Sequence, residues 1–137
     1  MSAVRGPEED PGTARVAGWT AFSCVLLVLA GALNLVNGLT ALEDPSFFTG
    51  PIVYDNLTFW GWVFLVWGVL QLVAAWLVVT GSTAGFKLGA VIASTATVVW
   101  FVMVYAEPWS AMVGVLLNAA ILYGLTVGAL GRVSAPR

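Results

Sequence analysis

Four carboxamide side chains are the groups within the apolar part of this sequence that could bind a ligand. They are spread over three apolar segments, as Asn34 and Asn37, Gln71, and Asn118. An amide exposed to lipid is costly, so we expect these side chains to point inward and to hydrogen-bond between helices, each bond contributing about 0.6 to 2 kcal/mol. Two interpretations stay open. The amides hold the helices together, or they line a polar niche for a small neutral or amphiphilic ligand.

A second candidate is a group of acidic residues at the ends of the apolar segments. Carboxylate oxygens bind divalent cations, but the spacing of these acids does not resemble an EF-hand. We therefore interpret them mainly as a marker of one side of a membrane, with a weak cation site as the alternative. The acids are Glu43, Asp44, Asp55 and Glu107.

Other kinds of chemistry are disfavoured by the residues that the sequence lacks. It has no histidine, and Cys24 is its one cysteine, so the commonest general base and a thiolate metal cage are both missing. No Asp, Glu, Lys or Arg lies in the interior of an apolar segment. We expect no catalytic residue, no metal centre and no cofactor. The net charge of −2 also disfavours binding to nucleic acid.

The elements that carry the amides are predicted to be membrane-spanning helices. The chain is 60% hydrophobic and 9% charged, whereas soluble domains have about 45–50% and about 25%. Four apolar stretches, uncharged apart from Lys87 near the start of the third, approach or exceed the roughly 20 residues that cross a bilayer. We predict an all-α, antiparallel bundle of four transmembrane helices with a disordered tail over 1–16, a loop over 43–57 and a short tail over 132–137. The helices are expected over about 17–42, 58–80, 84–105 and 108–130.

Basic residues predict the orientation of this bundle. With four spans, all five lie on the same side of the membrane, and the positive-inside rule makes that side cytoplasmic. Both termini are then cytoplasmic, in a multi-pass protein of the cell membrane. The 43–57 loop lies outside, where we expect it to cover Asn34 and Asn37 as a lid. The basic residues are Arg5, Arg15, Lys87, Arg132 and Arg137.

Glycines at a spacing of four predict close helix packing. Gly85 and Gly89 share one face of the third segment, and Gly124 and Gly128 share one face of the fourth. Such faces let helix backbones approach closely in membranes. We expect these halves of the third and fourth helices to pack against each other or against a second subunit. The expected partners are therefore the lipid bilayer and either another membrane protein or a second copy of the chain.

Six short pieces of the sequence carry a resemblance to a known family: Gly18-Trp19, Ala30 to Leu42, Tyr54-Asp55, Thr58 to Trp62, Thr80-Gly81 and Pro108-Trp109-Ser110. With these pieces the chain resembles a family of small actinobacterial four-helix integral membrane proteins described only as a domain of unknown function. The resemblance implies a fold and a bacterial inner membrane, without a substrate. The layout is more remotely similar to the DoxX-like and the small multidrug resistance proteins. The latter family relies on a glutamate inside its first helix, which this chain lacks.

The sequence thus favours a non-enzymatic membrane protein. We expect an accessory or scaffolding subunit, or a bundle that binds lipid or a small ligand. The alternative is a small oligomeric transporter or channel-like protein for a neutral or amphiphilic solute, with the amides along its path. An enzyme is disfavoured because its catalytic groups would have to come from the acids outside the helices alone.

Overall fold

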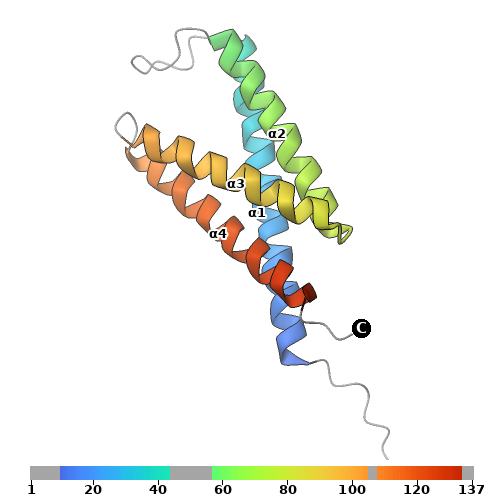
Figure 1. The fold of residues 1–137 in the computed structure, drawn as a ribbon. Coiled ribbons are helices and arrows are strands. Elements are labelled where there is room, and N and C mark those ends of the chain that lie inside the picture. The colour runs from blue at the N-terminus through green and yellow to red at the C-terminus, as the bar shows by residue number, and fades with distance from the viewer. Residues whose placement is uncertain (1–9, 44–56, 105–107, 134–137) are drawn as a thin grey trace, which may run out of the picture.

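The computed structural model describes residues 10–43, 57–104 and 108–133, which form four α-helices (Figure 1). All four are long and apolar enough to cross a membrane, and no strand occurs in these three ranges. The all-α, four-helix fold predicted from hydropathy is confirmed. The helices are α1 (Pro11–Glu43), α2 (Leu57–Val79), α3 (Thr83–Met103) and α4 (Pro108–Val133).

The first helix begins earlier than predicted. Asp10 precedes it as an N-cap: its Oδ1 accepts a hydrogen bond of 3.1 Å from the Gly12 N–H, and its backbone oxygen accepts one of 2.9 Å from Thr13. Pro11 occupies the first helical position, where its missing N–H costs nothing. Residues 11–16, predicted to belong to a disordered tail, are therefore helical. That prediction relied on composition, whereas the Asp-Pro cap decides the local structure. The rest of the predicted tail lies outside the described residues.

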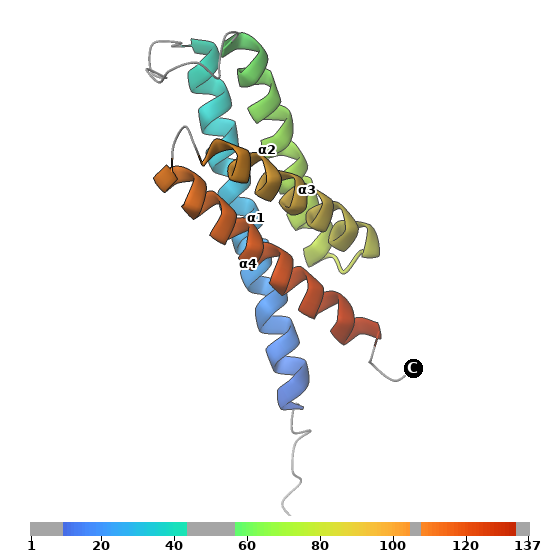
Figure 2. The same ribbon diagram turned by 60° about the vertical axis from the view of Figure 1, so that its left-hand side comes forward.

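The helices are arranged as two hairpins that cross obliquely (Figures 1 and 2). α1 packs along α2, and α3 packs along α4, while α1 also contacts α4 and α2 contacts α3. We call the end of the bundle with Glu43, Leu57 and Pro108 the loop end, and the opposite end the terminal end. In both views the two hairpins meet towards the terminal end and diverge towards the loop end.

A tight turn joins the two hairpins at the terminal end. Gly81 has a φ of 80°, in the left-handed region that favours glycine. The Ser82 N–H then donates to the Leu77 carbonyl at 2.9 Å, and the Gly81 N–H donates to Val78 at 3.0 Å. This pattern is that of a Schellman motif, which satisfies the last carbonyls of a helix. It ends α2 and reverses the chain into α3.

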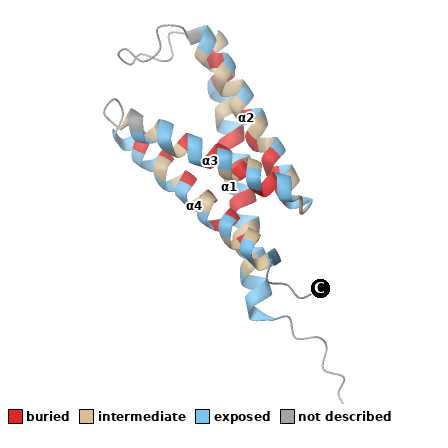
Figure 3. Ribbon diagram, in the orientation of Figure 1, coloured by how far each residue is buried: buried red, intermediate tan, exposed pale blue. Residues whose placement is uncertain are grey.

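The apolar core lies in the half of the bundle nearer the terminal end. Leu27 of α1 and Ile121 and Leu125 of α4 are fully or almost fully buried there, and Phe86 of α3 packs with them. Many buried residues lie where the hairpins cross (Figure 3). The buried Ser23 hydroxyl donates to the Ile121 carbonyl at 3.3 Å, which ties α1 to α4. This half of the bundle is closed by packed side chains.

Two pairs of glycines bring α1 and α2 into backbone contact. A Cβ atom on Gly38 would lie 2.8 Å from the carbonyl oxygen of Gly61, and one on Gly31 would lie 3.0 Å from that of Gly68. Gly31 and Gly38 are seven residues apart on α1, and Gly61 and Gly68 are seven apart on α2, so the two glycines of each helix lie on one face. Such close approach is typical of membrane helices with small residues at their interface. This interface was not predicted from the sequence.

The predicted glycine faces of α3 and α4 are buried within the chain. Gly85 lies against the backbone of Leu77 at the end of α2, and Gly89 faces Leu125 of α4. Gly124 and Gly128 both face side chains of α1. Close packing is therefore found, mostly between the hairpins and only partly between α3 and α4. Association with a second copy stays a prediction, and these four glycines are already covered by the chain's own helices.

Candidate functional site

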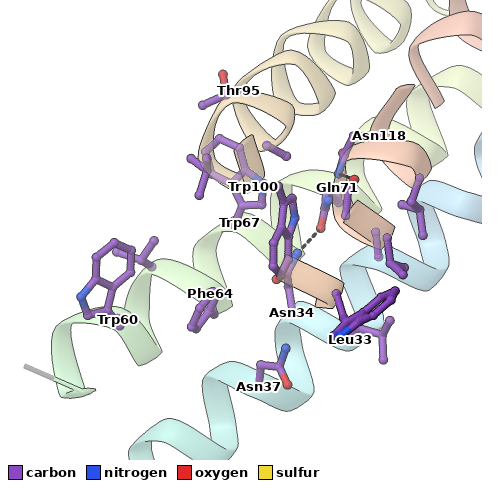
Figure 4. Close-up of a pocket in the computed structure, with 18 residues that line it drawn as sticks. Leu33, Asn34, Asn37, Trp60, Phe64, Trp67, Gln71, Thr95, Trp100 and Asn118 are labelled. Atoms are coloured by element: carbon purple, nitrogen blue, oxygen red, sulfur yellow. Dashed lines mark hydrogen bonds between the residues drawn. The ribbon is translucent and has the colours of Figure 1, made fainter. Parts of the chain in front are cut away.

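A cavity of about 690 Å³ lies between the hairpins in the half of the bundle nearer the loop end (Figure 4). Its lining comes from all four helices, over residues 30–37 of α1, 60–71 of α2, 95–100 of α3 and 109–118 of α4. The volume falls within the range of about 300–1,000 Å³ that is usual for sites of small ligands. The divergence of the hairpins thus produces a space large enough for a ligand inside a membrane domain.

All four amides of the predicted polar niche line this one cavity: Asn34, Asn37, Gln71 and Asn118. The Asn34 Nδ2 donates a hydrogen bond of 2.7 Å to the Gln71 Oε1, which joins α1 to α2 (Figure 4). Gln71 is almost completely buried, with 2% of its surface exposed. Asn34 is half-buried and Asn37 is exposed. The amides therefore serve both interpretations, because one pair links helices while all four face the cavity.

Asn118 has an incomplete set of hydrogen bonds. Its Nδ2 donates to the Gly114 carbonyl one turn earlier in α4, at 2.8 Å. Its Oδ1 is buried and has no hydrogen-bond partner, and only 3% of the residue is exposed. The Gly114 carbonyl determines the orientation of the amide, because a flipped amide would place two acceptor oxygens together. A buried acceptor without a partner lowers the stability of the fold by about 1–3 kcal/mol. The Asn118 Oδ1 is therefore a position at which a ligand with a hydrogen-bond donor would gain binding energy.

Aromatic rings form much of the wall of the cavity. Four tryptophans line it, two from α2 and one each from α3 and α4: Trp60, Trp67, Trp100 and Trp109. Phe64 lies between the first two along α2, and its ring centroid is 6.3 Å from that of Trp60. The ring of Trp100 fills the space that a side chain at position 114 would occupy, so Gly114 makes room for it. Rings provide a flat apolar surface with a polar N–H group at one edge.

The tryptophans were not predicted as site residues, although the sequence contains a signal for them. Trp60, Phe64, Trp67 and Gln71 are spaced by four, three and four residues. This spacing places them on one face of a helix. A face that combines three aromatic rings with an amide is distinct from a lipid-facing aliphatic face. The partner on α3, Trp100, has no such signal, because its position depends on how the two hairpins cross.

Among the residues that the structure describes, no charged side chain lines the cavity. Thr95 adds a hydroxyl, but it is exposed and already donates to the Val91 carbonyl at 2.9 Å. A charged ligand would therefore lose its hydration without gaining an ion pair, which is strongly unfavourable. The chemistry of the lining suits an uncharged molecule with an apolar body and few polar atoms.

The acidic group lies almost entirely outside the described residues. Glu43 is exposed at the last position of α1, and Asp44, Asp55 and Glu107 fall in ranges that the structure does not describe. Among the residues that are described, no three acidic, histidine or cysteine side chains come together as a metal site. The predicted lid, residues 43–57, likewise lies outside the description apart from its two end residues.

The fold and the cavity define a multi-pass membrane protein made of two crossed helical hairpins around a space whose described lining is uncharged and contains amides and tryptophans. A family model for a domain of unknown function (DUF7144) matches residues 19–129. The chain belongs to this family, and the match includes every residue that lines the cavity. No curated protein and no solved structure matches the chain, so the remoter likeness to DoxX-like proteins is not shown.

Proposed function

We propose that this protein is a non-enzymatic membrane protein that binds a small uncharged or amphiphilic ligand in the cavity between its hairpins. The observation that carries the proposal is the convergence of amides and tryptophans from four helices on one space of about 690 Å³. Known ligand sites combine mainly apolar walls with a few polar groups that orient the ligand. An accessory role for a larger membrane assembly is compatible with such binding.

The alternative, a transporter for a similar solute, requires a second opening at the terminal end. Between the cavity and that end, the bundle is closed by Leu27, Ile121 and Leu125, which are at most 2% exposed. Transport would therefore require the two hairpins to separate there. Flux of a neutral solute into proteoliposomes would favour this alternative over simple binding.

Filling the cavity is expected to remove the bound ligand. Val99 lines the cavity and Val98, the residue before it on α3, is exposed outside it. A Val99→Trp variant should lose at least about nine-tenths of its ligand, because the larger ring occupies the space. A Val98→Trp variant should keep it. The measurement is mass spectrometry of the small molecules and lipids that copurify, per mole of protein, in mild detergent.

Equal recovery from the two variants, with the same molecules as from the wild-type protein, would contradict a ligand in this cavity. The comparison controls for the added ring, since both variants carry one tryptophan more on the same helix. Folding is checked by helical content, which should be unchanged in both.

The orientation that we propose places the loop end outside the cell. Arg15 and Lys87 both lie near the terminal end, and both are exposed. In a Cys24→Ala background, a cysteine replacing Ser46 should react with a membrane-impermeant maleimide on intact cells. One replacing Ser2 should react only after the membrane is opened. The opposite pattern would invert the orientation. Cys24 is the one native cysteine, and it is buried. Its replacement by alanine ensures that any labelling comes from the introduced cysteine.

A further inference from the structure

We propose that the ligand bears an uncharged hydroxyl that donates a hydrogen bond to the Oδ1 of Asn118, with its apolar chain along the tryptophan wall. The chemical class is a long-chain alcohol or a neutral lipid with a free hydroxyl. This inference rests on the proposed function, since it identifies the ligand of the same cavity.

The head group is specified by the unpaired acceptor. The Oδ1 of Asn118 is buried without a partner, and the residue lines the cavity. A donor held in the cavity therefore reaches this oxygen once the side chains that cover it shift. A ketone, an ester or an ether offers acceptors only and would leave this oxygen unpaired. An ammonium group would supply a donor, but it would bring a charge into an uncharged lining at membrane depth. A hydroxyl satisfies both requirements.

The route to the cavity is from the side, through lipid. Leu33 of α1 and Val113 of α4 both line the cavity, and they are 52% and 64% exposed. Both belong to helices that are long and apolar enough to cross a membrane, so we expect the part of their exposed surface that does not face the cavity to face hydrocarbon. A ligand can therefore pass from the bilayer into the cavity without crossing water. Its chain would lie against Trp67 and Trp100 and would extend into the bilayer between the diverging hairpins.

The test compares two probes that differ in one hydrogen-bond donor. Full-length protein in phosphatidylcholine nanodiscs is titrated with 9,10-dibromostearyl alcohol or with its methyl ether, and quenching of tryptophan fluorescence is recorded. Only the saturable part that excess oleyl alcohol displaces is counted, because exposed tryptophans such as Trp62 and Trp76 are also quenched from bulk lipid. The alcohol should bind about tenfold more tightly than the ether, since the ether leaves the buried acceptor unpaired.

The variant Asn118→Leu should bind both probes equally, whereas Thr126→Val should keep the preference for the alcohol. Thr126 lies on the same helix, outside the cavity, and its hydroxyl donates to Leu122. If the wild-type protein binds alcohol and ether equally, the inference is overturned while the proposed function stands. If neither probe shows saturable binding, the inference is overturned as well, and the copurification experiment with Val99→Trp and Val98→Trp decides the proposed function. If Asn118→Leu still prefers the alcohol to the ether, the assignment to this oxygen is overturned. If this variant does not fold, the comparison of the two probes on the wild-type protein still decides the inference.

Discussion

Gly38→Val is expected to lower the free energy of unfolding by about 2–3 kcal/mol, the largest effect of any single substitution considered for this fold. A Cβ atom at position 38 would lie 2.7 Å from the Cγ of Leu65 and 2.8 Å from the carbonyl oxygen of Gly61. A backbone oxygen cannot rotate away, so α1 and α2 must separate to admit the side chain. Separation removes dispersion contacts along the interface, and these contacts are a main source of helix association in lipid.

Gly18→Val is the matched control, because it makes the same replacement on the same helix. No atom lies within 4 Å of a Cβ built on Gly18, so its effect should stay within about 0.5 kcal/mol. Both variants are measured by titration with sodium dodecyl sulfate in mixed micelles, with helical content as the readout. Equal midpoints for the two variants would show that α1 and α2 do not meet at Gly38.

The same glycines position the amides of the cavity. Asn34 lies between Gly31 and Gly38 on α1, and Gln71 lies one turn from Gly68 on α2. Because the two backbones touch at the glycine pairs, short polar side chains between them can reach each other across the interface. The 2.7 Å bond between Asn34 and Gln71 is therefore a consequence of the close approach. A variant that separates the helices should lose this bond too.

The sequence was sufficient to predict four spanning helices and the amides that converge on the cavity. Uncharged stretches of sufficient length have few alternatives to a membrane helix. Amides within such helices are expected to point away from lipid, and Asn34, Gln71 and Asn118 all line the cavity. The expected hydrogen bond between helices joins Asn34 to Gln71, whereas Asn118 donates to the Gly114 carbonyl of its own helix. The helices and the inward-facing amides could be predicted because both depend on lipid as the surrounding solvent more than on which residue lies beside them.

Features that depend on which surfaces meet could not be predicted in this way. The crossing of the hairpins opens the cavity, and the packing of α3 along α4 places Trp100 over Gly114, but the sequence of a single helix specifies neither arrangement. The start of α1 at Pro11 was not predicted, because the polar, proline-rich composition of this stretch indicates a disordered tail. The local Asp-Pro cap nevertheless starts a helix there. The glycines of α1 and α2 repeat at seven residues, and their meaning appears only when the two helices are aligned antiparallel, Gly31 with Gly68 and Gly38 with Gly61.

The second large effect is expected from the amide pair that crosses this interface. Asn34→Leu should lower the free energy of unfolding by about 1–3 kcal/mol, because it leaves the acceptor of the 2%-exposed Gln71 without its donor. The double variant Asn34→Leu/Gln71→Leu should be more stable than the sum of the two single effects predicts. Removing both partners leaves no unpaired group, and an apolar pair is tolerated in this environment. The coupling should be about 0.6–2 kcal/mol.

Asn37 provides the control for this cycle, because it is the same residue type one turn further along α1. It lines the same cavity but is exposed, and within the described residues no hydrogen bond joins it to Gln71. The pair Asn37→Leu and Gln71→Leu should therefore be additive in the same detergent titration. Additivity in both cycles would mean that the bond between Asn34 and Gln71 does not form in a lipid-like environment. Coupling in the first cycle alone would mean that the Asn34–Gln71 pair stabilises the hairpin while Asn37 makes no such contribution and stays available to a ligand.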